Sequence, residues 1–291
     1  MKTSSVELVN SQYSAMSSHT ALHQAALADD AITCQALLLS GTDRANMDDC
    51  GCTALNLSCY KGSMHVFRVL IVGACAVEIN MPLDNSYPPH YFGSDWGWQH
   101  QTPLMSVILC ERQEHRFEML YALLSRWDVA VNAQDRSGET ALHLVMYEEY
   151  MDIKLCQLLL KRCDLDVNAQ NKEGNTPLHI LTSQGDDHLE GNETLLPHCV
   201  MCMFLCRREL VPDLRNKDGD TPLHCAARSG NITLTRLLLF HGGADANIRN
   251  NKSQTPLECC LSTESGHRLR RLLASHLNPT ISFKRWITLE L

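Results

Sequence analysis

A short motif that begins Thr-x-Leu recurs along the chain and constrains its fold more than any other feature. The intervals between successive copies are 33, 49, 38, 36, 45 and 34 residues. Recurrence at roughly 20 to 50 residues is typical of arrays of small structural units. The chain is therefore predicted to be a repeat protein whose units carry the threonines Thr20, Thr53, Thr102, Thr140, Thr176, Thr221 and Thr255.

The residues around each threonine predict a tight turn followed by a helix. A glycine two residues earlier suits a turn that needs positive φ, and Asn or Asp five residues earlier can bond its own turn. The threonine is a natural N-cap, and the proline that often follows it suits the first helical position. The glycines are Gly51, Gly138, Gly174 and Gly219, and the prolines are Pro103, Pro177, Pro222 and Pro256.

Leucine clusters farther along predict a second helix in each unit, as in Leu158–Leu160 and Leu237–Leu239. A helix pair of this size can bury its apolar face only against the next pair, so the end units need caps. In the last predicted helix, Leu269, Leu272, Leu273 and Leu277 form an inner face, and arginines at 268, 270 and 271 cover the outer one.

The segment from Asp218 to Ala227 reads DGDTPLHCAA and nearly matches the ankyrin consensus. The chain resembles the ankyrin-repeat family over residues 19–277. The resemblance implies an all-α ankyrin-repeat solenoid of seven helix-turn-helix repeats with two loop insertions. Residues 1–18 are expected to be a disordered N-terminal segment, and residues 278–291 a C-terminal tail.

A histidine follows the leucine of the motif in four copies, at His23, His143, His179 and His224. A lone histidine would suggest a ligand or a base. Because it recurs at one position of the repeat, we expect a buried side chain whose hydrogen bonds tie neighbouring turns together.

The first insertion, from Met81 to Gln101, is rich in aromatic residues. Aromatic side chains on a loop are typical of binding hot spots, and equally of a loop that packs on its own scaffold. Both interpretations stay open here. The residues predicted to contact a partner are Tyr87, Tyr91, Phe92, Trp96 and Trp98.

The second insertion, Ser183–Pro197, is polar and acidic and is expected to be a mobile surface loop. Beyond it, Cys199, Cys202 and Cys206 suggest zinc at first. Their spacing puts them on one helical stripe, and no matching second pair of ligands is found, so they are predicted to be core residues. We expect no metal and no cofactor.

Composition excludes several classes of function. The net charge of -8 disfavours nucleic acid, and the longest apolar run, Val69–Val77, is too short to span a membrane. Fourteen cysteines without a signal sequence indicate a reducing compartment, the cytosol or the nucleus. No phosphate-binding loop or catalytic motif is found, so the protein is predicted not to be an enzyme. It is also expected to be monomeric by itself.

The predicted function is to bind a protein partner, of unknown identity, through a concave face and loops. One class is an inhibitor or co-regulator of a transcription factor, resembling the inhibitor of NF-kappa-B family, although that family's N-terminal phosphorylation degron is not matched. An alternative resembles the ankyrin and SOCS-box ubiquitin-ligase adaptors, for which residues 278–291 are too short to hold the box unless the chain is truncated at its C-terminus. A zinc-binding protein is the third class.

Asparagine hydroxylation is a further expectation, because ankyrin repeats present an asparagine after the second helix to asparaginyl hydroxylases. The pattern places a leucine eight residues before the asparagine. Asn168 fits it fully, and Asn247 and Asn132 fit its spacing. An asparagine there also satisfies turn backbone whether or not it is modified.

Overall fold

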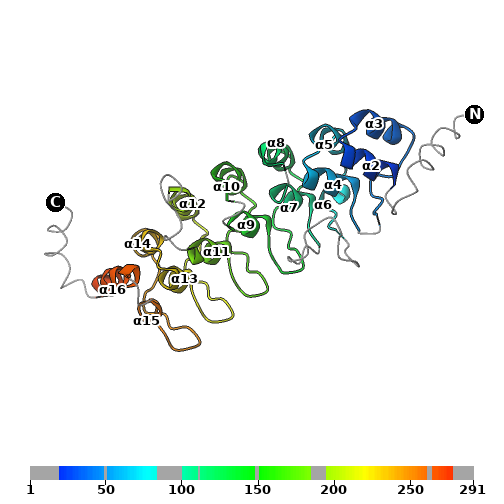
Figure 1. The fold of residues 1–291 in the computed structure, drawn as a ribbon. Helices are drawn as coiled ribbons and strands as arrows, with labels where there is room; N and C mark the ends of the chain where they lie inside the picture. Colours follow the sequence, from blue (N-terminus) through cyan, green and yellow to red (C-terminus); the bar gives the residue numbers. More distant parts are fainter. Residues whose placement is uncertain are drawn as a thin grey trace, which may run out of the picture. The chain divides into compact units, whose positions relative to one another are not determined.

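The computed structural model in Figure 1 describes residues 20–48, 51–83, 100–110, 112–147, 151–184, 195–260 and 264–277. It divides into two compact units, Met1–Leu144 and Val145–Leu291. Within the described residues the regular elements are helices, and the extended pairing is an isolated bridge between Met47 and Thr53. None of the described helices combines the length and the apolar character that crossing a membrane requires.

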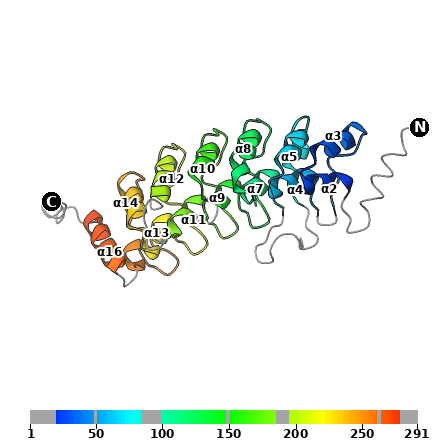
Figure 2. The same ribbon diagram turned by 45° about the horizontal axis from the view of Figure 1, so that its top comes forward.

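The first unit is built from helix pairs in two layers. In the inner layer the first helices α2, α4 and α7 pack side by side, and in the outer layer the second helices α3, α5 and α8 do the same (Figure 2). The short α6 precedes α7, and α9 crosses the boundary between the units. The bounds are α2 (Ala21–Ala28), α3 (Ala31–Leu39), α4 (Ala54–Lys61), α5 (Met64–Ile71), α6 (Ala76–Asn80), α7 (Pro103–Ile108), α8 (Gln113–Leu124) and α9 (Ala141–Val145).

The second unit repeats this arrangement. Its first helices α11, α13 and α15 form one row, and α10, α12, α14 and α16 form the other. The bounds are α10 (Ile153–Leu160), α11 (Pro177–Ser183), α12 (Leu195–Leu205), α13 (Pro222–Ser229), α14 (Ile232–Phe240), α15 (Pro256–Cys259) and α16 (Glu264–Leu277).

The motif threonines start the first helices, as predicted. The hydroxyl of Thr176 accepts a hydrogen bond from the backbone N–H of His179, and Thr255 accepts one from Glu258 in the same way. Proline occupies the first turn of α7, α11, α13 and α15, where its missing N–H leaves no helical hydrogen bond unmade.

Burial differs between the two layers because their neighbours differ. The first helices lie between helices on several sides, and residues 177–182 of α11 are all buried. The second helices bury one face, so Leu238 is fully buried while Phe240 is 54% exposed. The predicted capping helix α16 follows the same rule, with Leu269, Leu272 and Leu273 buried and the arginines at 268, 270 and 271 exposed.

The prediction that Cys199, Cys202 and Cys206 are core residues is wrong. Cys202 and Cys206 are exposed and Cys199 is half-buried. The same helix, α12, instead buries Val200, Met201 and Phe204 completely. These larger side chains remove more apolar surface from water than three thiols would, so the helix turns that face inward.

Glycines hold the turns of the second unit close together. Gly174 and Gly219 have φ of +76° and +75°, which favours glycine. A Cβ added to Gly219 would lie 2.7 Å from the backbone nitrogen of Asn251, and one added to Gly174 would lie 2.9 Å from that of Lys217. Neighbouring turns therefore leave no room for a side chain at these two positions.

Replacing Gly219 by alanine separates backbone strain from this close approach. Gly243 also has positive φ, +69°, but a Cβ there would meet no atom within 4 Å. Strain of the left-handed backbone should lower the free energy of unfolding of both Gly→Ala variants by about 1 kcal/mol. Overpacking should lower it by roughly 1–3 kcal/mol more in Gly219→Ala. Urea unfolding followed by circular dichroism measures the difference, and equal losses would show that the turns do not press on each other.

Candidate protein-binding surface

Buried histidines link each turn to the next in the second unit. The backbone N–H of Thr176 donates to Nδ1 of His179 at 3.1 Å, so this nitrogen is an acceptor. The other ring nitrogen, Nε2, therefore carries the proton and donates to the carbonyl of Asp220 at 3.0 Å. His224 repeats the pattern with Thr221 and with the carbonyl of Gln254, also at 3.0 Å.

The first unit contains the same arrangement. Nδ1 of His23 is 2.7 Å from the hydroxyl oxygen of Thr20, and Nε2 of His23 is 2.8 Å from the carbonyl oxygen of Cys52. His143 bonds Thr140 through Nδ1. The prediction that these histidines are buried and tie turns together is confirmed for His23, His179 and His224, and no nitrogen of those rings is left to act as a base.

Asparagines shape the turns from inside. The side-chain oxygen of Asn216 accepts hydrogen bonds from the backbone N–H groups of Asp218 and Asp220, both at 3.0 Å. Asn171 and Asn250 do the same in the neighbouring turns, and Asp135 does so in the first unit. This confirms the predicted role of the Asn or Asp five residues before the threonine.

Backbone hydrogen bonds then join the turns edge to edge. The N–H of Lys217 donates to the carbonyl of Glu173 at 2.9 Å, and the N–H of Asn251 donates to the carbonyl of Asp218 at 2.9 Å. The side chain of Asn251 adds a bond to the carbonyl of Lys217 at 2.7 Å. Three consecutive turns thus form one hydrogen-bonded layer with a fixed register.

The outer edge of this layer is the candidate functional site. We name it the turn surface; it consists of the exposed residues Lys172, Glu173, Arg215, Lys217, Asp218, Arg249, Asn251 and Lys252. Five of these residues are basic and two are acidic. Arg215 and Arg249 also bond carbonyls across their own turns, which orders their side chains.

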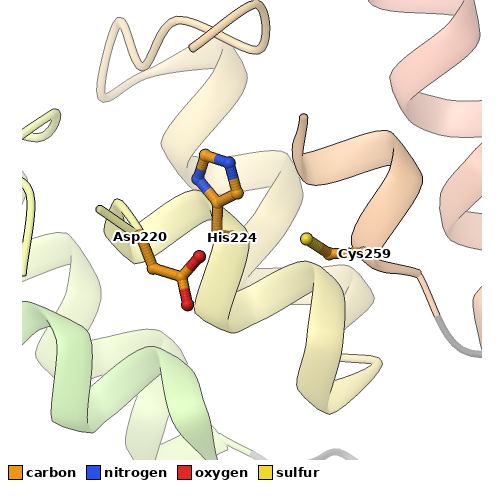
Figure 3. Close-up of side chains that lie close together, drawn as sticks. All are labelled: Asp220, His224 and Cys259. Carbon is orange, nitrogen blue, oxygen red and sulfur yellow. The ribbon is translucent and has the colours of Figure 1, made fainter. Parts of the chain in front are cut away.

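A polar group beneath the turn surface has the composition of a metal site. Figure 3 shows Asp220, before α13, with His224 of α13 and Cys259 of α15. Their potential ligand atoms all lie within 4.8 Å of one another. The three residues come from two neighbouring repeats.

Each of these three side chains already has other partners, so the cluster does not fit a metal. Asp220 accepts from Asn250 at 2.7 Å and from Arg228 at 2.5 Å. Both ring nitrogens of His224 are occupied by the bonds described above. Arg228 also brings a positive charge against Asp220, which disfavours a cation there.

The pKa values follow from the same contacts. Burial raises the pKa of the Cys259 thiol, which disfavours the thiolate that a metal needs. Burial alone would raise the pKa of Asp220, but hydrogen bonds from Asn250 and Arg228 together hold it below its usual value. Burial lowers the pKa of His224, although its bond to Gln254 and the charge of Asp220 act in the opposite direction.

The aromatic residues predicted to contact a partner, at 87, 91, 92, 96 and 98, lie outside the described residues. The two ends of their insertion are described. The N–H of Leu83 donates to the carbonyl of Gln101 at 2.9 Å, and the N–H of His100 donates to the carbonyl of Leu83 at 3.1 Å. The insertion therefore begins and ends at one point of the first unit.

Asn168 bridges two repeats with its side chain. Its amide donates to the carbonyl of Glu209 at 2.6 Å, and its oxygen accepts from the N–H of Val211 at 2.9 Å. Asn247 bonds Asp245 instead, and Asn132 is exposed. Sequence reasoning missed Asn80, which bridges to Asp128 and Ala130 in the same manner. Hydroxylation at these positions stays a prediction.

Arginine–carboxylate pairs after three second helices were also missed. Arg126 donates two hydrogen bonds to the carboxylate of Asp128, of 2.9 and 2.7 Å. It also donates to the carbonyls of Ile71 and Ala74 in the preceding repeat. Arg162–Asp164 and Arg207–Glu209 repeat the pair. The sequence signal was an Arg-x-Asp/Glu triplet that begins two residues after Leu124, Leu160 and Leu205.

An apolar groove of about 260 Å³ lies between α5 and α8 in the first unit. Met64, Phe67, Phe117 and Tyr121 line it, and the ion pair of Arg68 with Glu118, 3.0 Å apart, also borders it. Phe117 and Tyr121 are 41% and 59% exposed, so the groove is open to solvent.

Stacked pairs of short helices joined by bonded turns define a repeat protein of the ankyrin class. The sequence profile described as Ankyrin repeats (3 copies) matches residues 104–202 and 194–282, which together make up more than half of the chain. The chain belongs to the ankyrin-repeat family. Ankyrin repeats imply protein–protein interaction, and the family is generally non-catalytic. Among curated proteins, no sequence matched the chain.

Solved structures support the same fold. The ankyrin repeat domain of Bcl-3, described as a unique member of the IkappaB protein family, is 22% identical, with a TM-score of 0.63 over 88% of this chain and 100% of that one. The ankyrin repeat protein EF0377 is 21% identical, with a TM-score of 0.58 over 76% and 96%. The human ASB11 ankyrin repeat domain is 17% identical, with a TM-score of 0.58 over 88% and 98%.

Acid should weaken the bridge at His224. Because burial lowers the pKa of His224, the folded state disfavours its protonation, so the stability it contributes is complete above the ordinary value of about 6.5 and is lost as pH falls below it. At pH 7.5, His224→Gln should lower the free energy of unfolding by roughly 1–3 kcal/mol. Between pH 7.5 and 5.5, the free energy of unfolding should fall less in this variant than in the wild type.

Urea unfolding at pH 7.5, 6.5 and 5.5 measures both effects. His241→Gln, at the exposed C-cap of α14, is the control and should follow the wild type. Parallel pH profiles for the wild type and His224→Gln would contradict the assigned proton arrangement.

Proposed function

We propose that this protein is a non-enzymatic binding protein that holds a partner protein on its turn surface. The observation that carries the proposal is the hydrogen-bonded layer of turns that ends in exposed, charged side chains. We also infer that the chain comprises seven repeats, with residues 19–277 as the ankyrin-repeat domain.

The order of this layer supports a role in binding. A surface that is rigid before it meets its partner loses little conformational entropy on association, so more of the contact energy appears as affinity. The side chains of Lys172, Lys217 and Lys252 are exposed, whereas the backbone that carries them is fixed by neighbouring turns. Side-chain identity at the turns can then determine which partner binds.

For the partner's class, we propose a regulator of transcription, so that the protein acts as an inhibitor or co-regulator in the cytosol or nucleus. The ubiquitin-ligase adaptor is the alternative. The likeness to Bcl-3, whose description names the IkappaB family, and the likeness to human ASB11 rest on the shared fold. Asn168 is proposed as the first hydroxylation site within either role.

Site-specific crosslinking tests where the partner binds, independently of charge. A photoreactive phenylalanine analogue at position 217 or 252 should give a crosslinked species of the same mass from cell extract after irradiation. The analogue at Lys154 or Lys161, exposed on the outer helix α10 and at its end, is the matched control and should give none. Crosslinks at the control positions alone would refute the proposed surface.

The aromatic insertion is proposed as a second contact. Replacing residues 85–98 by Asn-Gly should leave helical content and the melting temperature nearly unchanged, because the ends of the insertion already bond each other and shortening a loop changes its closure entropy little. Capture of the crosslinked partner should fall.

The outcome that contradicts this second contact is loss of the cooperative thermal transition. Tyr87, Tyr91, Phe92, Trp96 and Trp98 would then stabilise the fold rather than the complex. A variant with all five replaced by serine at unchanged loop length is the control for length, and it should lose the partner while keeping its melting temperature.

A further inference from the structure

The turn surface carries charge opposite to that of the whole chain. Five basic and two acidic residues give it a surplus of three positive charges, whereas the chain carries -8. Glu258, 3.2 Å from Arg249, reduces the local surplus to two. We propose that this surface binds an acidic segment of a partner protein. The inference rests on the proposed function and adds the chemistry of the partner.

The basic side chains are held in sequence along one edge. Lys172 and Lys217 occupy the same position of consecutive turns, directly after the shaping asparagines Asn171 and Asn216. Lys252 lies one position later in the third turn. Because the bonds from Lys217 to Glu173 and from Asn251 to Asp218 fix the register, the three lysines stand in a row.

The acidic residues of the surface do not cancel this row. Lys217 and Glu173 form an ion pair 3.7 Å apart, but their side chains are 66% and 72% exposed. Such an exposed pair contributes about 0–1 kcal/mol, so Lys217 can exchange it for a better-placed carboxylate. Lys172 and Lys252 are exposed on either side of it.

The local charge acts on a partner although the whole chain is acidic. Interactions between exposed charges are screened beyond about 8 Å at physiological ionic strength. A carboxylate docked on the turns therefore meets the basic row more strongly than it meets distant acidic residues. The same field raises the rate of encounter with an acidic segment and lowers it for a basic one.

A protein segment fits this surface better than nucleic acid does. Glu173 and Asp218 lie within the row and would face phosphates. The turn residues at 170–174, 215–219 and 249–253 include no aromatic side chain on which a base could stack. A peptide can direct its carboxylates to the lysines and its neutral residues to the two acidic positions.

Charge reversal at matched positions tests the inference. The turn variant is Lys172→Glu, Lys217→Glu and Lys252→Glu. The control variant is Lys154→Glu, Lys161→Glu and Arg271→Glu, three exposed residues on or beside the outer helices α10 and α16. Each variant changes the net charge by the same amount, so only the location of the change differs. Circular dichroism melting verifies that both are folded.

The probe is a fluorescein-labelled peptide of twelve alternating glutamates and serines, measured by fluorescence anisotropy at 50 and 200 mM NaCl. Wild type should bind it, and more weakly at the higher salt concentration. The turn variant should lose at least about tenfold in affinity, and the control variant less than about threefold. Any binding of a peptide of lysines and serines should not weaken in the turn variant.

Three results would overturn the inference. Equal losses in the two variants would show a response to net charge alone, and a twelve-nucleotide single strand that binds more tightly than the peptide would assign the surface to nucleic acid. Absence of peptide binding to the wild type would refute the acidic partner. Crosslinking at position 217 would still stand in that case, so the proposed function and this inference fail separately.

Discussion

A neutral histidine with one proton on Nε2 is the interaction that joins neighbouring turns at His23, His179 and His224. It accepts from its own threonine and donates to a carbonyl in the next turn, as His179 does to Asp220. Protonation would put a second N–H against the threonine N–H, so the link needs the uncharged ring. Because the acceptor is backbone, the histidine fixes the position of the next turn whatever side chains that turn carries.

The first helices contribute mainly to stability, whereas the turns remain available for binding. The first helices have neighbours on most sides and bury almost every residue, as in α11. The buried polar side chains of Asp220 and His224 bond to Asn250 and to the backbone of the next turn. Among the described residues, the turns and the outer faces of the second helices remain accessible, and such surfaces are suited to binding.

Sequence reasoning found whatever depends on local geometry. The roles of the motif threonines and prolines are local, and the histidines recur at one position of the repeat, so these roles could be predicted from residue type and spacing. It failed on α12, because helical spacing shows that Cys199, Cys202 and Cys206 share a face but not which face is buried. The arginine pairs were missed because their carbonyl acceptors, such as those of Ile71 and Ala74, lie in another repeat, some fifty residues away in sequence.

The backbone hydrogen bonds on both sides of the turn at Gly219 limit how the length of that turn can change in evolution. One residue added to that turn would move two backbone bonds out of register together, toward Glu173 and toward Asn251. A whole extra loop is tolerated where its two ends bond each other, as Leu83 bonds Gln101 and His100. Descendants of this chain should therefore change their turns by replacement of side chains or by long inserted loops, and rarely by one or two residues.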